Sequence, residues 1–195
     1  MGYIKHGKKV VYISLLRGIN VSGQKSIKME ALRRLYEGLG FQNVSTYVQS
    51  GNVIFTHEDA DTDQLEGAIA RKIEKEFAFA VTVLVLTAEK LGQVIDNNPF
   101  VKESGRLSQH LYVTFLSAKP ENHGQNAILT HCRNGEEVRF GEHAVYLYVP
   151  KGYGRTKINN NFVESRLKVN ATTRNWKTTN ELFKLAKQIN PVKWE

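Results

Sequence analysis

Short apolar runs and helical spacings alternate along the first 87 residues. Residues 9–16 (KVVYISLL) are almost continuously apolar and end at Arg17-Gly18, which predicts a central strand buried on both faces. The other predicted elements are helices over residues 28–39 and 61–77, a hairpin of strands over 44–49 and 53–56, and a strand over 81–86. This strand-helix-strand-strand-helix-strand order is ferredoxin-like, with four antiparallel strands and two helices on one face.

The second half of the chain repeats this order less completely. Its predicted elements are a helix over 88–97, a strand over 109–116, a helix over 121–132, a hairpin over 137–149, and helices over 161–168 and from residue 178. Asn161 with Glu164, and Thr178 with Glu181, have the spacing of capping boxes. We therefore predict an α+β protein of two ferredoxin-like halves, in which the second ends in an extra helix rather than a closing strand.

The expected domains are residues 1–87 and residues 88–195. No low-complexity linker divides them, so a rigid joint near Thr87 is favoured over a flexible one. With 195 residues, of which 41% are hydrophobic and 24% charged, the chain has an ordinary globular composition.

The composition also indicates in which cell compartment the protein lies and which kinds of site it lacks. No apolar run approaches the roughly 20 residues of a membrane helix, and residues 1–9 lack the pattern of a secretory signal. The single cysteine, Cys132, excludes an internal disulfide framework and fits a reducing cytoplasm, which is the expected location. The six histidines are scattered without metal-binding spacing, so we expect neither a metal nor a cofactor.

Positive charge is concentrated near the C-terminus. The chain has a net charge of +8, and its last 45 residues carry ten Lys/Arg against three Asp/Glu, a net charge of +7. Such a field attracts phosphate-bearing partners, although a basic surface that only keeps the protein soluble explains the charge equally well.

A first candidate site follows from the predicted topology. In the ferredoxin-like order the first strand ends at the same edge of the sheet as the first hairpin. This places Arg17 and Asn20 near Ser50 and Asn52, so that a guanidinium, two amides and a hydroxyl gather there. Turn chemistry alone also explains glycine and asparagine at these positions, but it does not require Arg17.

A second candidate site lies in the basic C-terminal segment. The sequence KGYGRTK, residues 151–157, holds three cations beside two glycines, and such a loop can surround an anion with backbone N–H groups and cations. It matches neither a Walker A loop nor a dinucleotide-binding motif. The candidate ligand-binding residues of this segment are Tyr153, Arg155, Lys157, Glu164, Thr173 and Arg174.

Several stretches resemble a bacterial family of proteins of unknown function, domain-of-unknown-function family sixteen-ninety-seven. They are residues 15–55 (LLRGINVSGQ to NVIF), 97–100 (NNPF) and 153–186 (YGRTKINNNFVESRLKV to ELFKLA). The resemblance spans residues 11–188 and implies a pair of ferredoxin-like halves. Its motifs fall at residues 17–20, 50–53, 98–100, 153–157 with Asn161 and Glu164, and 171–176. Ser22 departs from the glycine usual in the family, which weakens any close backbone approach there.

Three functional hypotheses stay open from the sequence. The first is a binding protein for an anionic small molecule or a nucleic acid, without a membrane partner. The second is an enzyme acting on a phosphorylated or anionic substrate, with Glu164 as the only evident carboxylate near the cations. In the third, the polar motifs form a structural seam between the halves. The oligomeric state is left open.

Overall fold

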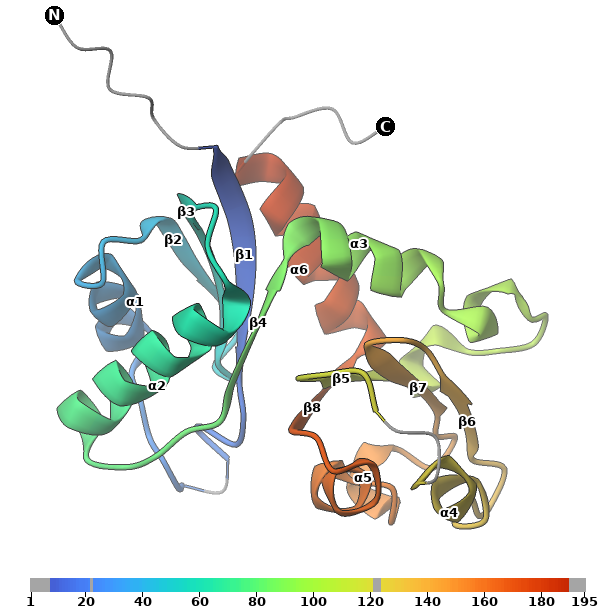
Figure 1. Cartoon of the computed structure of the whole chain (residues 1–195). Helices are drawn as coiled ribbons and strands as arrows, with labels where there is room; N and C mark the ends of the chain where they lie inside the picture. The colour runs from blue at the N-terminus through green and yellow to red at the C-terminus, as the bar shows by residue number, and fades with distance from the viewer. Residues whose placement is uncertain (1–7, 22, 121–123, 190–195) are drawn as a thin grey trace, which may run out of the picture. The chain divides into compact units, whose positions relative to one another are not determined.

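The computed structural model describes residues 8–21, 23–120 and 124–189 (Figure 1). Ser22 lies outside the described residues, and so do residues 121–123 of the helix predicted over 121–132. The chain divides into two compact units. The first runs to Glu89 and takes in the chain from Leu182 onward, and the second is Lys90–Glu181. The predicted domain boundary and rigid joint stay predictions.

The first unit has the ferredoxin-like fold that the sequence predicts. Its elements are β1 (Lys9–Leu16), α1 (Met29–Glu37), β2 (Gln42–Tyr47), β3 (Asn52–Glu58), α2 (Thr62–Phe77) and β4 (Val83–Thr87). The strands form an antiparallel sheet in the order β2-β3-β1-β4. Figure 1 shows α1 and α2 on the same face of this sheet. Because β1 lies inside the sheet, six of its eight residues are buried, as its apolar run predicts.

Aromatic rings fill the space between this sheet and its helices. The Phe55 ring stacks on Phe41 with centroids 4.4 Å apart and on Tyr12 at 5.5 Å. The hydroxyls of Ser14 and Tyr36 form a buried hydrogen bond of 2.7 Å. Burial raises the pKa of Tyr36, so its phenol stays neutral and keeps this bond at physiological pH.

A carboxylate of α2 accepts a hydrogen bond from β4, the edge strand of the same sheet. The backbone N–H of Val85 in β4 donates to Glu66 Oε1 at 2.8 Å. Burial raises the pKa of Glu66 from 4.5 to about 6, the Val85 hydrogen bond opposes this shift, and Asp63 and Asp61 add to it. The N–H of the edge strand thus has an acceptor. The hydrogen bond is opposed by the free energy needed to remove the Glu66 carboxylate partly from water.

The shifted pKa of Glu66 predicts a pH-dependent stability. A carboxyl group whose pKa is higher in the folded state binds its proton more tightly there, so its contribution to stability is lost as pH rises from 4.5 through about 6. Glu66→Gln keeps an acceptor for Val85 without the charge, and we expect it to lose this part of the pH dependence. Urea unfolding of both proteins at pH 4.5, 6 and 7.5 measures the difference. Equal pH dependence in the two proteins would show that Glu66 does not carry it.

The second unit also has a complete ferredoxin-like order, so its predicted lack of a closing strand is wrong. Its strands are β5 (Leu111–Leu116), β6 (Glu137–Phe140), β7 (Ala144–Tyr148) and β8 (Ala171–Asn175), and its helices α4 (Gln125–Leu129) and α5 (Asn160–Leu167) connect them. The helix α3 (Ala88–Asp96) precedes these elements, and its first two residues belong to the first unit. The short 3-10 turns are η1 (Pro99–Lys102), η2 (Ser108–His110) and η4 (Tyr153–Arg155). The sheet order is β6-β7-β5-β8, the same as in the first unit. β8 pairs antiparallel with β5, and α4 and α5 cover one face (Figure 1).

The helix starts of the second half also differ from the predicted capping boxes. The N-cap of α5 is Asn159, whose side chain accepts from Phe162 N. The final helix, α6 (Trp176–Ile189), begins directly after β8, and the Asn175 side chain accepts from Thr178 N at 2.7 Å. Asparagine therefore caps both helices, as its side chain favours, but at other positions than the spacing predicts.

Two negative findings concern the described residues only. None of their helices has the length and apolar character needed to span a bilayer. Nor do three or more of their His, Cys, Asp or Glu side chains gather into a group that could hold a metal ion.

Candidate functional site

Asn20 joins two loops at one end of the first sheet. Its Nδ2 donates to Gln49 O at 2.8 Å and to Ile27 O at 2.9 Å, and its Oδ1 accepts from Ile27 N at 2.8 Å. The loop after β1 therefore lies beside the β2–β3 turn, as the topology predicts. The Asn20 amide is engaged with backbone atoms on both sides, which gives it a structural role at this sheet end.

The other predicted residues of this sheet end lie in the same turn or beside it. Asn52 is fully buried, and its Nδ2 donates to Tyr47 O at 3.0 Å and to Ser50 Oγ at 2.9 Å. Ser50 is exposed and the Arg17 side chain is half-buried, while Arg17 N donates to Thr82 O at 2.9 Å. A ligand-binding role for Arg17, Asn20, Ser50 and Asn52 stays a prediction.

In the second unit, the loop of residues 151–157 carries three exposed cations. Gly152 has a φ of +84°, a conformation that side chains disfavour, and the turn η4 follows it. Arg155 N donates to Gly152 O at 3.1 Å, which closes this turn. Lys151, Arg155 and Lys157 are all exposed. We call this segment the cationic loop.

Tyr153 fastens the cationic loop to the sheet. Its hydroxyl donates to Thr173 Oγ1 in β8 at 2.9 Å, and Thr173 in turn donates to Asn160 Oδ1 at 2.6 Å. The Thr114 hydroxyl in β5 lies 2.7 Å from the same Thr173 oxygen. The sequence indicates Tyr153 and Thr173 but not Asn160 or Thr114, which become neighbours only through the pairing of β5 with β8.

Thr173 and Arg174 lie on opposite faces of the second sheet. Thr173 pairs with Thr114 and Arg174 with Val113, and successive strand residues alternate between faces. Arg174 Nη1 donates to Thr172 Oγ1 at 3.0 Å and to Thr173 O at 2.9 Å. Burial lowers the pKa of this guanidinium to about 10, against an opposite effect of Tyr153. Arg174 is thus charged at neutral pH and held against its own strand.

The Glu164 carboxylate joins α5 to the start of β8. Its Oε1 accepts from Ala171 N at 2.9 Å. The sequence pairs Glu164 with Asn161 at a helix start, whereas the structure uses it to accept a backbone N–H seven residues later.

A pocket of about 540 Å³ opens at the same end of the second sheet as the cationic loop. Its lining comprises Ser108, Gln109, Tyr112, Asn175, Trp176, Lys177, Asn180 and Glu181. The Tyr112 ring also packs against Tyr153 of the cationic loop, with centroids 5.3 Å apart. Tyr112 and Trp176 are half-buried, which leaves part of each ring accessible. We call this the aromatic pocket.

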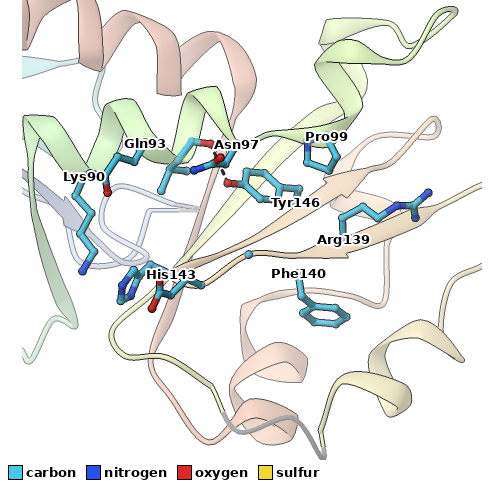
Figure 2. A pocket seen from close by; sticks show the side chains of 11 residues that line it. Lys90, Gln93, Asn97, Pro99, Arg139, Phe140, His143 and Tyr146 are labelled. Atoms are coloured by element: carbon cyan, nitrogen blue, oxygen red, sulfur yellow. Dashed lines mark hydrogen bonds between the residues drawn. The ribbon is translucent and has the colours of Figure 1, made fainter. Parts of the chain in front are cut away.

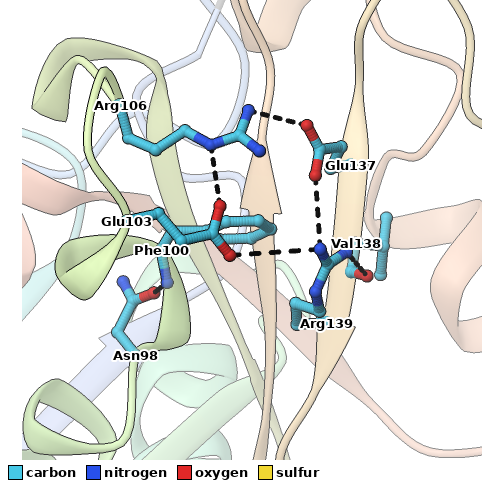
Figure 3. A network of polar contacts seen from close by, with 7 residues as sticks. All are labelled: Asn98, Phe100, Glu103, Arg106, Glu137, Val138 and Arg139. Carbon is cyan, nitrogen blue, oxygen red and sulfur yellow. Dashed lines mark hydrogen bonds and ion pairs between the residues drawn. The ribbon is translucent and has the colours of Figure 1, made fainter.

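A network of two arginines and two glutamates surrounds Phe100 in the same unit (Figure 3). Arg106 contacts Glu137 at 2.6 Å and Glu103 at 2.9 Å, and Arg139 contacts Glu137 at 3.3 Å. The Arg139 guanidinium lies 5.1 Å from the centre of the buried Phe100 ring. The charges balance within the network, which therefore stabilises the segment after α3 against β6.

Asn98 explains the remaining motif, residues 98–100. Its side chain caps η1 by accepting from Phe100 N at 3.1 Å, Pro99 occupies the first turn, and Phe100 is fully buried. This motif therefore has a structural role in the second unit.

The fold and these motifs define an α+β protein made of two ferredoxin-like units. The chain belongs to the family described as "Protein of unknown function (DUF1697)", whose model matches residues 10–146. The cationic loop and β8 lie beyond this matched stretch. No protein among the curated sequences matches the chain.

Among solved structures, the chain is similar to the conserved bacterial protein SP0830 from Streptococcus pneumoniae. The TM-score is 0.68 at 24% sequence identity, and the match covers 92% of this chain and 100% of the other. At this identity the likeness shows the fold alone.

Proposed function

We propose that the protein binds a phosphate-bearing ligand with a nucleobase, a nucleotide or a single-stranded nucleic acid, at one end of the second sheet. The observation that carries this proposal is the contact between Tyr112 and Tyr153, because it makes the aromatic pocket and the cationic loop neighbours.

The cationic loop supplies the phosphate-binding part of the proposal. Lys151, Arg155 and Lys157 are exposed within seven residues, and Tyr153 holds the loop on the sheet through Thr173. A loop anchored in this way presents its charges from a fixed position, which reduces the ordering that binding requires. Thr173, Glu164 and Arg174 then position the loop and its strand rather than touch the ligand.

The aromatic pocket supplies the base-binding part. Tyr112 and Trp176 offer ring surfaces on which a base can stack, an interaction of about 1–3 kcal/mol per base. Gln109 and Asn180 line the same pocket with amides that can donate to and accept from a base edge.

The enzyme hypothesis receives less support from the geometry. It depends on Glu164 as an acid or base, and this carboxylate accepts a hydrogen bond from Ala171 N at 2.9 Å. A role in joining α5 to β8 accounts for that contact.

The test is a binding titration at two salt concentrations with a short single-stranded RNA, a matched DNA and common nucleotides. We expect binding that weakens as salt rises, because counterion release becomes less favourable. Arg155→Gln with Lys157→Gln should weaken it by about tenfold and flatten its salt dependence. Trp176→Leu should weaken binding with little change in the salt dependence, because stacking involves no charge.

The matched control removes two cations from the first unit. Lys28 and Lys75 are both exposed, and Lys28 makes no side-chain capping bond. Lys28→Gln with Lys75→Gln lowers the net charge equally and should leave affinity nearly unchanged. The proposal fails if no probe binds at low salt, or if the two double variants weaken binding equally.

A further inference from the structure

A pocket of about 510 Å³ lies within the first unit, between α2, the residues just before β2 and the end of β3. We call it the α2 pocket. Its volume is within the range of about 300–1,000 Å³ that is common for small-molecule sites. Its apolar lining includes Leu39, Phe41 and Leu65, and its charged lining includes Asp63 and Arg71. The pocket thus combines an apolar wall with an acidic and a basic side chain.

The apolar wall of the α2 pocket is held in place by the core of the first unit. The buried Phe41 ring stacks on Phe55 with centroids 4.4 Å apart, and the His57 ring meets it edge-on at 5.0 Å. The turn before α2 is fixed by Tyr12, whose hydroxyl donates to Ala60 O at 3.2 Å and accepts from Ala60 N at 3.0 Å. A ligand therefore meets a wall that is already ordered, which reduces the cost of binding.

Gly67 makes room for the Arg71 guanidinium beside the helix. Glycine is less favourable than alanine in a helix interior, yet Gly67 lies inside α2. A Cβ at this position would lie 3.1 Å from Arg71 Nη1 and 3.8 Å from both Cζ and Nη2. The Arg71 side chain therefore runs back along α2 by one turn, and its guanidinium lies against the helix at Gly67. Because Arg71 is exposed, this guanidinium is accessible to a ligand in the pocket.

The acidic and the basic side chain of the α2 pocket do not neutralise each other. Within the part of the chain that the structure describes, neither Asp63 nor Arg71 takes part in an ion pair. Asp63 precedes Gly67 by four residues, a rise of about 6 Å along the helix, so the two charges lie on one side of α2 about a turn apart. A ligand with a single charge is attracted by one of these groups and repelled by the other, whereas a zwitterion matches both.

We propose that the α2 pocket binds a small zwitterion with an apolar side chain, such as an aromatic amino acid. Its carboxylate contacts Arg71 and its ammonium group contacts Asp63. Its apolar side chain packs on Leu39, Phe41 and Leu65. This site lies in the first unit and does not depend on the function proposed above.

The test follows the amide signals of the full-length protein by NMR at constant ionic strength, with L-phenylalanine as the probe. Three further probes each lack one feature: phenylpropionate the ammonium group, phenethylamine the carboxylate, and glycine the apolar side chain. We expect L-phenylalanine to cause saturable shifts at lining residues such as Gly67 and Ala68, and the other probes to bind about tenfold more weakly or less. The Trp176 indole signal, from the aromatic pocket, should not shift.

Two charge variants assign the contacts. Arg71→Met removes the guanidinium but keeps most of the aliphatic stem, and Asp63→Asn removes the charge but keeps the shape. Each should weaken L-phenylalanine binding by about tenfold, because each removes one charged hydrogen bond. Arg71→Met should not weaken phenethylamine, and Asp63→Asn should not weaken phenylpropionate. Lys75→Met, an exposed cation of α2 outside the pocket lining, is the control and should leave affinity unchanged.

Gly67→Ala separates binding from folding. The added methyl group displaces the flexible guanidinium from its place in the pocket, while alanine favours the helix interior. Affinity for L-phenylalanine should therefore fall, although the urea midpoint should not. The proposal is overturned if L-phenylalanine causes no saturable shifts at the lining residues, if a probe that lacks one charge binds as tightly, or if Arg71→Met or Gly67→Ala binds L-phenylalanine as the wild type does.

Discussion

Replacing Gly124 by alanine is expected to destabilise the second unit by about 3 kcal/mol or more. Gly124 precedes α4, where a Cβ would lie 2.0 Å from the backbone oxygen of Arg166 in α5 and 2.7 Å from its carbonyl carbon. Both are backbone atoms, so relief requires that α4 and α5 move apart. The φ of Gly124 is −86°, which alanine adopts without strain, and the effect is therefore steric alone.

Gly154→Ala is the matched control for this substitution. Gly154 also lies in the second unit with a negative φ, but a Cβ there would meet no atom within 4 Å. Urea and thermal unfolding of both variants measure the difference, and we expect Gly154→Ala to stay close to the wild type. An equally stable Gly124→Ala protein would contradict the close approach of α4 to α5.

The first unit follows from the sequence because its signals are local. The apolar run of β1 and the helical spacing of α2 each lie within one element. Asp61, where the second helix is predicted to begin, is the N-cap of α2 and accepts from Gln64 N. The bounds of these elements therefore agree with the prediction to within a few residues.

The closing strand β8 could not be predicted from such local signals. Its sequence, ATTRN, has no apolar run, and the hydroxyls of Thr172 and Thr173 and the amide of Asn175 fit helix caps equally well. The strand forms because its backbone pairs with β5, which is about 60 residues away in the chain. Two adjacent β-branched threonines were the available signal, since such residues favour strands.

The missed strand also changes the candidate site. Without β8, the sequence predicts Thr173 and Arg174 together in a stretch just before the last helix, where both belong to one candidate anion site. Strand alternation instead turns Thr173 toward Tyr153 and Arg174 toward the other face. A pocket between α3 and the β6–β7 hairpin of the second unit (Figure 2) shows the same limit, because Lys90 and His143 both line it but share no local spacing and come together only through the packing of α3 on β7.

The net charge of the C-terminal segment correctly indicates that the cations of the cationic loop are exposed, but it gives no sign that Arg174 is partly buried. Lys151, Arg155 and Lys157 are exposed, whereas Arg174 is half-buried with a lowered pKa. A count of charges treats all four alike, although a buried guanidinium contributes little to the field that a ligand meets outside the protein.

Gly51→Ala should destabilise the first unit by about 2–5 kcal/mol, through two separate effects. Gly51 lies in the β2–β3 turn with a φ of +70°, where alanine is strained. A Cβ would also lie 2.7 Å from Leu16 Cβ and 2.9 Å from two atoms of Ile19, and both side chains are fully buried. The turn would therefore have to move away from the end of β1, which it contacts through the 2.8 Å bond from Leu16 N to Gly51 O.

Gly18→Ala separates these two effects. Gly18 has nearly the same φ, +69°, but a Cβ there would meet no atom within 4 Å. Its alanine variant should lose only the conformational part, about 1–2 kcal/mol. The difference between the two variants in urea unfolding then measures the close packing of the β2–β3 turn on β1. If both variants lose the same stability, Gly51 does not pack as closely on Leu16 and Ile19 as the structure shows. The same result would contradict the idea that this packing fixes Ser50 and Asn52 at this end of the sheet.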